Sequence, residues 1–211
     1  MKRGLFITFE GIDGAGKSTQ LPWAVDHLRG LGLTLISTRE PGGTPLGENV
    51  RDLLLAAKEP VHAETETLLV FAARRQHIEQ IIRPALVRGD CVLCDRFTDA
   101  TFAYQGGGSG VDKTRLAVLE RWVHADLQPD LTLLFDVSAE VGQGRVTRIK
   151  SPDRFEREGK VFFTRVREAY LERMNESPQR IVRIDGTAPI ADVQSALGNA
   201  LDRTVAKWKA A

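Results

Sequence analysis

The 211 residues carry 29 basic and 28 acidic side chains, which gives a formal net charge of +1. This length suits one domain of ordinary size with a substantial core. So balanced a charge produces no global field that would attract nucleic acid or an anionic membrane, and we expect neither as a partner. The first apolar run is interrupted by Glu10, and no stretch approaches the length of a membrane span. These features predict a cytoplasmic protein with a single domain over residues 1–211.

The apolar pattern predicts strands and helices that alternate along the chain. Short apolar runs predict strands at 4–9, 33–37, 91–94, 131–135 and 180–184. Helical patterns cover 17–30, 46–57, 64–88, 113–125, 138–149, 161–176 and 189–208. Pro84 should kink the 64–88 helix or mark its last turns, and the glycine-rich residues 105–110 predict a flexible loop. The alternation predicts an α/β fold, a three-layer sandwich whose five-stranded, mostly parallel sheet is covered by helices on both faces.

A glycine-rich stretch, residues 10–18, lies between the first predicted strand and the first predicted helix. Gly11, Gly16, Lys17 and Ser18 match G-x-x-x-x-G-K-[ST], the phosphate-binding P-loop. Glycines let consecutive N–H groups converge on phosphate oxygens, and the helix N-terminus adds partial positive charge. The flanking strand and helix disfavour the alternative of a turn that binds nothing. We expect the following residues to bind ATP: Gly11, Ile12, Asp13, Gly14, Ala15, Gly16, Lys17, Ser18 and Thr19.

A carboxylate, Asp95, ends the third predicted strand. This is where the Walker B aspartate stands relative to a P-loop, and its role there is to hold Mg²⁺ directly or through water. By itself such an aspartate is equally well explained as a turn residue or a helix N-cap. Together with the P-loop, Asp95 and the Ser18 hydroxyl predict a site for the Mg²⁺ that ATP carries.

The arginines indicate which class of P-loop protein this is. The Asn-Lys-x-Asp motif of regulatory GTPases is absent, and Asp-x-x-Gly occurs only inside the P-loop, at residues 13–16. Arginine grips phosphate at two points, so several arginines near a P-loop suit an enzyme with two phosphate-bearing substrates. The candidates are Arg39, Arg51, Arg74, Arg96, Arg145, Arg148, Arg154 and Arg157.

The only two cysteines, Cys91 and Cys94, are three residues apart in the third predicted strand. This spacing occurs in redox and metal motifs, but residues i and i+3 of a strand point to opposite faces. We therefore expect two separately buried thiols.

Several further motifs, in this order and spacing, resemble those of the bacterial thymidylate kinase family over about residues 2–186. Besides the P-loop they are Thr-Arg-Glu-Pro-Gly-Gly-Thr at 38–44, Phe-Ala-Ala-Arg-Arg-Gln-His at 71–77, Asp-Arg-Phe at 95–97, Ala-Tyr-Gln-Gly-Gly-Gly at 103–108, Asp-Arg-Phe-Glu at 153–156 and Phe-Thr-Arg-Val-Arg at 163–167. The resemblance implies transfer of the ATP γ-phosphoryl group to dTMP. It also implies a homodimer, with the apolar face of the 64–88 helix as the expected contact.

The resemblance further implies roles for single residues. Asp13 would contact the deoxyribose 3′-hydroxyl, and Tyr104 would pack on the sugar. Residues 148–159 would form a mobile lid that brings Arg154 and Arg148 to the ATP phosphates, and residues 186–188 would lie against adenine. The implied catalytic residues are Lys17, Asp95, Arg96 and Arg154. Other implied dTMP contacts are Arg74, Arg96 and Arg51 at the phosphate, Thr101 and Gln105 at the thymine edge, and Pro41 in the pocket wall.

The chain departs from the family pattern at two positions. Where many members have the phenylalanine that stacks on thymine there is Val70, and Phe71 follows it. Both positions lie on one helix face, so Phe71 is expected to supply the ring, with a core phenylalanine as the alternative. Some members have an arginine in the P-loop where this chain has Gly14, which in the family goes with catalytic arginines from the lid.

The expected chemistry needs no general base. The acceptor is a phosphate monoester with a second pKa of about 6, so it is already a nucleophilic dianion near pH 7. Two alternatives stay open at this stage. The chain can be a kinase of another monophosphate, such as dCMP, UMP or AMP, or a regulator that uses ATP as a switch. Phosphoryl transfer to an added nucleotide discriminates between an enzyme and a switch.

Overall fold

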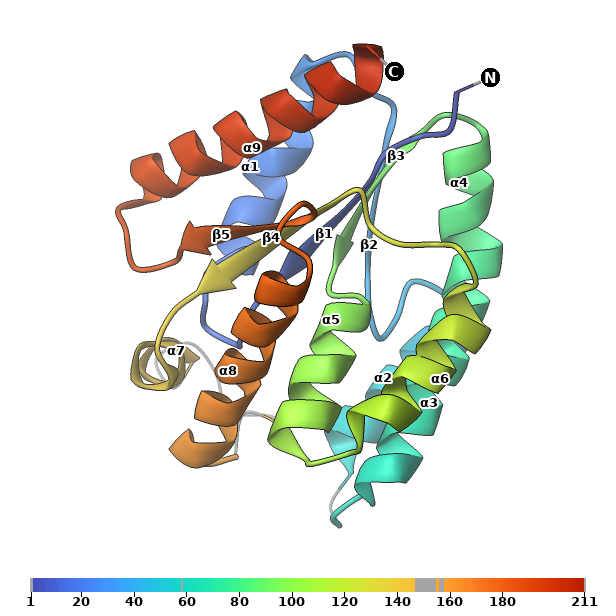
Figure 1. Cartoon of the computed structure of the whole chain (residues 1–211), viewed down its shortest axis with the longest axis vertical. Coiled ribbons are helices and arrows are strands. Elements are labelled where there is room, and N and C mark those ends of the chain that lie inside the picture. The colour runs from blue at the N-terminus through green and yellow to red at the C-terminus, as the bar shows by residue number, and fades with distance from the viewer. Residues whose placement is uncertain (1, 58, 147–154, 156–157, 211) are drawn as a thin grey trace.

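The computed structural model describes residues 2–57, 59–146, 155 and 158–210. Arg148 and Arg154, and most of the expected lid at 148–159, lie outside this part of the chain. Five strands form one sheet in the order β2-β3-β1-β4-β5, and every neighbouring pair is parallel (Figure 1). The predicted α/β architecture is confirmed. The strands are β1 (Phe6–Glu10), β2 (Leu35–Arg39), β3 (Cys91–Asp95), β4 (Leu131–Asp136) and β5 (Ile181–Asp185).

Helices cover both faces of the sheet. One face carries α1 and α9, and the other carries α4, α5 and α8 (Figure 1). This arrangement follows from right-handed crossovers between parallel strands. The helices are α1 (Lys17–Gly30), α2 (Pro45–Ala56), α3 (Ala63–His77), α4 (Arg83–Val87), α5 (Thr98–Thr101), α6 (Lys113–His124), α7 (Ala139–Val146), α8 (Lys160–Glu176) and α9 (Ile190–Ala210), with π-helical segments η1 (Ile78–Ile82) and η2 (Phe102–Gly108).

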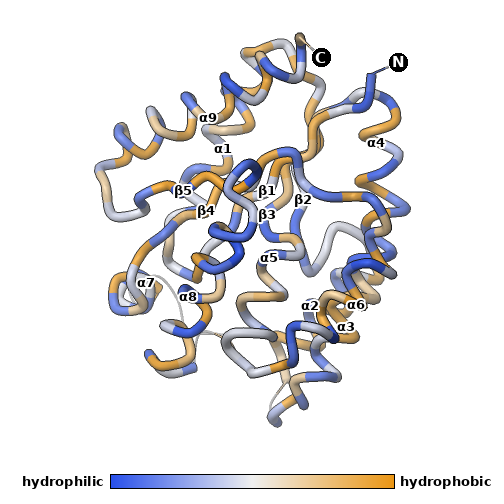
Figure 2. Tube along the Cα trace, in the orientation of Figure 1, coloured by the Kyte–Doolittle hydropathy of each residue, from blue (hydrophilic) through white to orange (hydrophobic). Residues whose placement is uncertain are grey.

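The core lies against the sheet on both sides. All five residues of β1 and all six of β4 are buried, and hydrophobic residues concentrate along the central strands (Figure 2). Parallel strands covered on both faces are expected to be apolar throughout, which explains why these segments were recognisable in the sequence. Cys91 and Cys94 are both buried and unpaired, and they belong to two different apolar clusters. The prediction of two separately buried thiols is confirmed.

Every strand ends one or two residues later than its apolar run predicted. The last residues are polar or charged: Glu10, Arg39, Asp95, Asp136 and Asp185. An apolar pattern stops where the side chains change character, although the backbone ladder continues. These polar ends meet at the carboxyl edge of the sheet, which is where α/β folds bind ligands.

The predicted loop at 105–110 and the predicted helix at 64–88 both need correction. Residues 102–108 form η2, so the expected flexible loop at 105–110 is wrong for its first part. The glycines there permit close packing on α8: a Cβ added at Gly107 would meet the Ala169 Cβ at 2.6 Å. The predicted 64–88 helix is divided into α3, η1 and α4, with Pro84 in the last of these, so proline marks the last turns. Proline has no N–H for the carbonyl four residues earlier, which interrupts the α-helical pattern there.

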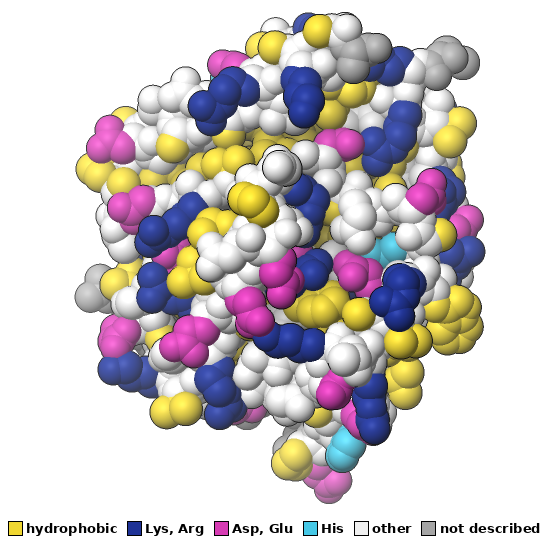
Figure 3. All heavy atoms as spheres, in the orientation of Figure 1, with side chains coloured by type: hydrophobic (Ala, Val, Ile, Leu, Met, Phe, Trp, Pro, Cys, Tyr) yellow, Lys and Arg dark blue, Asp and Glu magenta, His cyan; other side chains and the backbone are white. Residues whose placement is uncertain are grey.

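The surface mixes charges of both signs. On the face shown in Figure 3, lysines and arginines are interspersed with carboxylates, in keeping with the near-zero net charge. Within the described ranges, no helix is both long enough and apolar enough to cross a membrane.

Candidate functional site

The P-loop occupies the turn from β1 into α1. Gly11 has φ 131° and Gly14 has φ 75°, values that favour glycine. Their neighbours also exclude side chains, because a Cβ at Gly11 would lie 2.2 Å from the Phe135 carbonyl oxygen, and one at Gly14 would lie 2.2 Å from that of Gly142. Gly16 caps α1 without a side-chain hydrogen bond, so the first N–H groups of the helix are left for a ligand.

Lys17, the first residue of α1, lies folded against this loop. Its Nζ donates to the carbonyl oxygens of Gly11 (2.8 Å) and Ile12 (3.0 Å). Burial, and then the nearby charge of Arg96, lower the pKa of Lys17 to about 8, so the group is still mainly charged at neutral pH. Gly11 and Ile12 are themselves buried and shape the loop through these carbonyls, whereas residues 13–19 line the cavity in front of it.

Arg96 lies directly across from the P-loop. Its Nη2 donates to the Asp13 carboxylate at 2.6 Å and to the Tyr104 hydroxyl at 3.1 Å, while Nη1 donates to the Gly11 carbonyl and to the Tyr170 hydroxyl. Tyr104 also donates to Asp13, at 3.0 Å. Burial favours a raised pKa for Asp13, but the charges of Arg96 and Lys17 outweigh it and lower that pKa. Asp13 and Tyr104 are 91 positions apart in the sequence, and Arg96 and Tyr170 are 74 apart, yet the fold brings all four side chains into one cluster.

The backbone of Arg96 is unusual. Its φ is 70°, in the left-handed region that residues other than glycine rarely adopt. Such a conformation costs on the order of 1–3 kcal/mol and persists where the surroundings impose it, often at functional sites. Here the Phe97 N–H donates to the buried Glu10 carboxylate at 2.7 Å, which fixes the turn after β3. Burial, and then the charge of Asp99, raise the pKa of Glu10 to about 8.

The residues expected to hold Mg²⁺ fit a magnesium site. Ser18 and Asp95 line the same cavity, and the buried Oδ1 of Asp95 has no hydrogen-bond partner among the described residues. Oxygen ligands are what Mg²⁺ prefers, and it commonly uses one or two protein oxygens together with substrate phosphates and water. No group of three or more histidine, cysteine, aspartate or glutamate side chains in the described part of the chain forms a complete metal cage.

A second cavity adjoins the first and is lined on one side by Arg74. This arginine is 1% exposed; its Nε donates to Glu40 at 2.6 Å, and its Nη2 donates to the Phe97 carbonyl and to the Thr101 hydroxyl. Its Nη1 is buried and has no partner in the described residues. Arg74 therefore keeps one unused donor at the buried end of a side chain that lines this cavity and is bonded to Thr101.

Glu40 and His77 hold Arg74 in place. Glu40 accepts from Arg74 with one oxygen and contacts His77 Nδ1 with the other, at 2.9 Å, while His77 Nε2 lies 2.7 Å from the Thr38 hydroxyl. Burial tends to raise the pKa of Glu40, but the charge of Arg74 and then the contact with His77 lower it below its ordinary range. His77 thus supports the site indirectly, through Glu40.

Phe71 does not line this cavity, so its expected stacking role is corrected. It is 2% exposed and packs in an apolar cluster with Phe97, with its ring centroid 5.0 Å from the Arg74 guanidinium carbon. Val70 lines the cavity in its place. Neighbouring positions on one helix face still differ by about 100° in direction, and that difference turns Phe71 into the core. The second cavity is lined on its apolar side by Leu54, Leu55, Val70, Ala100 and Phe155.

The two cavities share one wall. Asp13, Glu40, Arg51 and Arg96 line both of them. The first cavity extends along the P-loop, with Asp95 and Lys17, to Gly186, Ala188 and Ile190. The second is lined by Pro41, Tyr104, Thr101, Gln105 and Arg74. The arrangement can hold two ligands whose charged ends meet at Arg96.

Two contributions to the site were missed by sequence reasoning. Arg145, on α7, donates to the carbonyls of Gly14 and Gly186 and lines the first cavity, so it joins the P-loop to the loop after β5. It was included only as one member of the arginine group. Glu40 was recognised as part of a motif but was given no role. The available signal was that Glu40 is the only carboxylate of residues 38–44, shortly after the strand predicted at 33–37.

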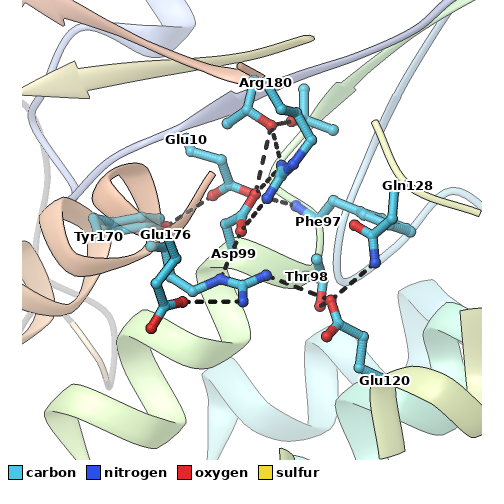
Figure 4. Close-up of polar contacts among 12 residues, drawn as sticks. Glu10, Phe97, Thr98, Asp99, Glu120, Gln128, Tyr170, Glu176 and Arg180 are labelled. Carbon is cyan, nitrogen blue, oxygen red and sulfur yellow. Dashed lines mark hydrogen bonds and ion pairs between the residues drawn. The ribbon is translucent and has the colours of Figure 1, made fainter. Parts of the chain in front are cut away.

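Behind the cavities, a buried ionic network surrounds Asp99 of α5 (Figure 4). Asp99 is fully buried and accepts hydrogen bonds from Arg173 at 3.0 Å and from Arg180 at 2.7 and 3.0 Å. Burial acts to raise the pKa of Asp99, but the hydrogen bonds and charge of Arg180, and then Arg173, lower it. This network joins α5, which carries Thr101, to α8 and β4, and so fixes one wall of the second cavity.

Comparisons with known proteins agree on one family. A sequence profile described as thymidylate kinase matches residues 9–197. A thymidylate kinase from Cupriavidus metallidurans is 58% identical over 195 residues, covering 92% of this chain and 96% of the relative. One from Bordetella pertussis is 55% identical over 205 residues, covering 97% and 98%. The crystal structure of thymidylate kinase from Ehrlichia chaffeensis superposes with a TM-score of 0.76 at 35% identity, covering 95% of this chain and 99% of that one.

Proposed function

Since this chain belongs to the thymidylate kinase family, we propose that it transfers the γ-phosphoryl group of ATP to dTMP, giving dTDP and ADP. The protein is a phosphotransferase of nucleotide biosynthesis. The observation that carries the specific reaction is the wall shared by the two cavities, because a kinase must bring two polyanions together at one point. Since its substrates are nucleotides of the cell interior, we place its activity in the cytoplasm.

The first cavity is the proposed ATP site. The N–H groups of the P-loop and of the first turn of α1 bind the phosphates, and Lys17 turns from the loop carbonyls toward the outer phosphates. Gly186 and Ala188 line the far end, where adenine is proposed to lie. Ser18 and Asp95 would hold Mg²⁺, which would supply positive charge beside the transferring group. From the family resemblance we also propose that a lid brings Arg148 and Arg154 to the ATP phosphates.

The second cavity is the proposed dTMP site. Arg96 and Arg51 lie on the shared wall and are proposed to bind the acceptor phosphate, with Asp13 at the 3′-hydroxyl and Tyr104 against the sugar. Arg74 was expected at that phosphate, but it lines only the second cavity, where it donates to Thr101. We therefore assign its unused Nη1 donor to a carbonyl oxygen of the base.

The chain's own residues act by positioning and by charge. The acceptor is a dianion near neutral pH, so no side chain needs to remove a proton from it. Arg96 holds the acceptor oxygens against the donor phosphate, and Lys17 and the N-terminus of α1 stabilise the charge that develops in transfer. The apolar residues of the second cavity keep water from replacing the acceptor.

A coupled assay of ADP release tests the proposal. Purified protein with ATP and Mg²⁺ is given dTMP, dUMP, dCMP, UMP or AMP in turn, beside a blank with no acceptor. The highest kcat/KM is expected with dTMP, over a low blank. A preference for another monophosphate would refute the base assignment, and an acceptor-independent rate would indicate an ATPase.

We also propose that the protein is a homodimer through α3 and α6. Apolar side chains are exposed on these adjacent helices: Leu68 on α3, and Val118 and Trp122 one turn apart on α6, the last 78% exposed. Clustered exposed apolar side chains mark interaction surfaces. Sedimentation equilibrium should give a dimer for the wild type and a monomer for Trp122→Glu. Val161→Glu, an exposed site on α8, should stay dimeric. A wild-type monomer at micromolar concentration would contradict the proposal.

A further inference from the structure

The side chain of Gln105 is held by a carboxylate that the proposed reaction does not use. Gln105 lies on η2, and its Nε2 donates to Glu66 Oε1 of α3 at 2.6 Å. Both side chains are buried, Gln105 at 4% and Glu66 at 2% exposed. The rest of Gln105 faces the second cavity, at the end that also contains Thr101 and Arg74.

The side-chain amide of Gln105 has a donor end and an acceptor end, and the hydrogen bond to Glu66 determines which end is left for a ligand. The NH₂ group can only donate and the carbonyl oxygen can only accept. The Glu66 oxygen accepts from the NH₂ end of Gln105, which leaves the carbonyl oxygen of the amide for a ligand. Glu66 also lies in the first turn of α3, where the helix dipole favours a negative charge.

The consequence is a fixed acceptor at the cavity surface. Gln105 Oε1 accepts no hydrogen bond from any residue within the described ranges. Arg74 lines the same cavity, and its Nη1 is a buried donor that has no partner in the described residues. The lining of this cavity therefore offers an unused acceptor from Gln105 and an unused donor from Arg74.

We propose that Glu66 is a positioning residue for base specificity, which holds the Gln105 amide so that only a base with an N–H at ring position 3 and a carbonyl at position 4 is paired. This inference rests on the proposed function and deepens it. Thymine and uracil have that pattern. Cytosine has the reverse, an acceptor at N3 and an amino group at C4. Its N3 would face the Gln105 oxygen, acceptor against acceptor, and its amino group would face the Arg74 N–H, donor against donor. Leaving buried polar groups unpaired is how a site rejects an analogue strongly.

The substitution Glu66→Gln tests this directly. A glutamine at 66 keeps the shape but can donate as well as accept, so it no longer dictates which end of Gln105 faces the cavity. We expect kcat/KM for dTMP to fall about tenfold or more, mainly through a higher KM, with kcat kept within about threefold. The ratio of kcat/KM for dTMP to that for dCMP should fall as well. Glu64→Gln, on the exposed side of the same helix turn, is the matched control and should change neither value.

A double-mutant cycle separates positioning from a general structural role. If Glu66 acts through Gln105, then Glu66→Gln should change kcat/KM for dTMP less than about twofold when Gln105 is already alanine. An equal loss in both backgrounds would overturn the inference, because Glu66 would then act without Gln105. Unchanged KM and selectivity in the single variant would overturn it too.

The same assays distinguish this inference from the function on which it depends. If the wild type does not phosphorylate dTMP, the proposed function fails, and the inference fails with it. If the wild type prefers dTMP and Glu66→Gln keeps that preference in full, the function stands and only the positioning role is refuted.

Discussion

Replacing Arg96 with alanine should lower kcat by about 10³-fold, which is the scale expected when a preorganised cation at a phosphoryl-transfer site is lost. Arg96 lies on the wall shared by the two cavities and is the proposed link between acceptor and donor phosphates. The KM for dTMP should also rise, since the same guanidinium is assigned to the acceptor phosphate. Arg96→Lys should recover little of the rate. The planar guanidinium of arginine can contact Asp13, Tyr104 and a phosphate at once, whereas the single ammonium group of lysine cannot.

The measurement is steady-state kinetics with dTMP and ATP varied in turn, together with the thermal unfolding midpoint of each variant. The midpoint matters because removal of Arg96 leaves the Asp13 carboxylate without its ion pair. Arg88→Ala is the matched control, since Arg88 is an exposed arginine paired with Asp90 near the opposite end of β3. A kcat within threefold of the wild type would refute the role assigned to Arg96.

Replacing Asp99 with asparagine should destabilise the protein by about 3–5 kcal/mol, because it leaves two arginines facing a neutral group in a buried network. Asp99 is fully buried, and the side chains of Arg173 and Arg180 are 16% and 14% exposed. The free energy of unfolding, measured with urea at pH 7, gives the size of the loss. Asp126→Asn is the control: this aspartate is 88% exposed and pairs with Arg83 at 3.4 Å, so its loss should cost less than about 1 kcal/mol.

The effect of Asp99→Asn should depend on pH in a defined direction. The pKa of Asp99 is lowered in the folded protein, so the ionised group stabilises the fold above the ordinary pKa of aspartate and loses that contribution as the pH falls through the folded value. The difference in stability between wild type and variant should therefore be full at pH 7 and narrow under acidic conditions. A difference that stays constant down to pH 3 would show that the charge of Asp99 is not what stabilises the network.

The sequence predicted the sheet and the P-loop because both depend on local patterns. Buried parallel strands are apolar runs, and the loop is defined by glycines and a lysine within nine residues. The assignment of Phe71 failed because rotation by one helix position moves a side chain from cavity to core, and periodicity cannot fix which of two adjacent residues faces the ligand. Our proposal moves Arg74 from the phosphate to the base of dTMP for a similar reason. An arginine's character predicts an anion, whereas its position beside Thr101 depends on long-range packing.

Pairings between distant segments were beyond the reach of sequence patterns. Nothing in the sequence around Glu66 or Gln105 indicates that an amide of η2 lies 2.6 Å from a carboxylate of α3. The same is true of Asp99, whose arginine partners are 74 and 81 positions away. In the sequence, each of these side chains resembles an ordinary exposed polar residue of a helix or loop. Only the structure shows that it is buried and paired.

The reactivity of the two thiols of β3 can be used to measure unfolding of this protein. Burial raises the pKa of Cys91 to about 12 and that of Cys94 well above its ordinary value, and neither side chain is more than 1% exposed. Since the thiolate is the reactive form, alkylating reagents meet almost none of it while the central sheet is closed. The rate at which either cysteine is modified therefore follows the population of molecules in which β3 has opened, and it measures the stability of the sheet without any added label.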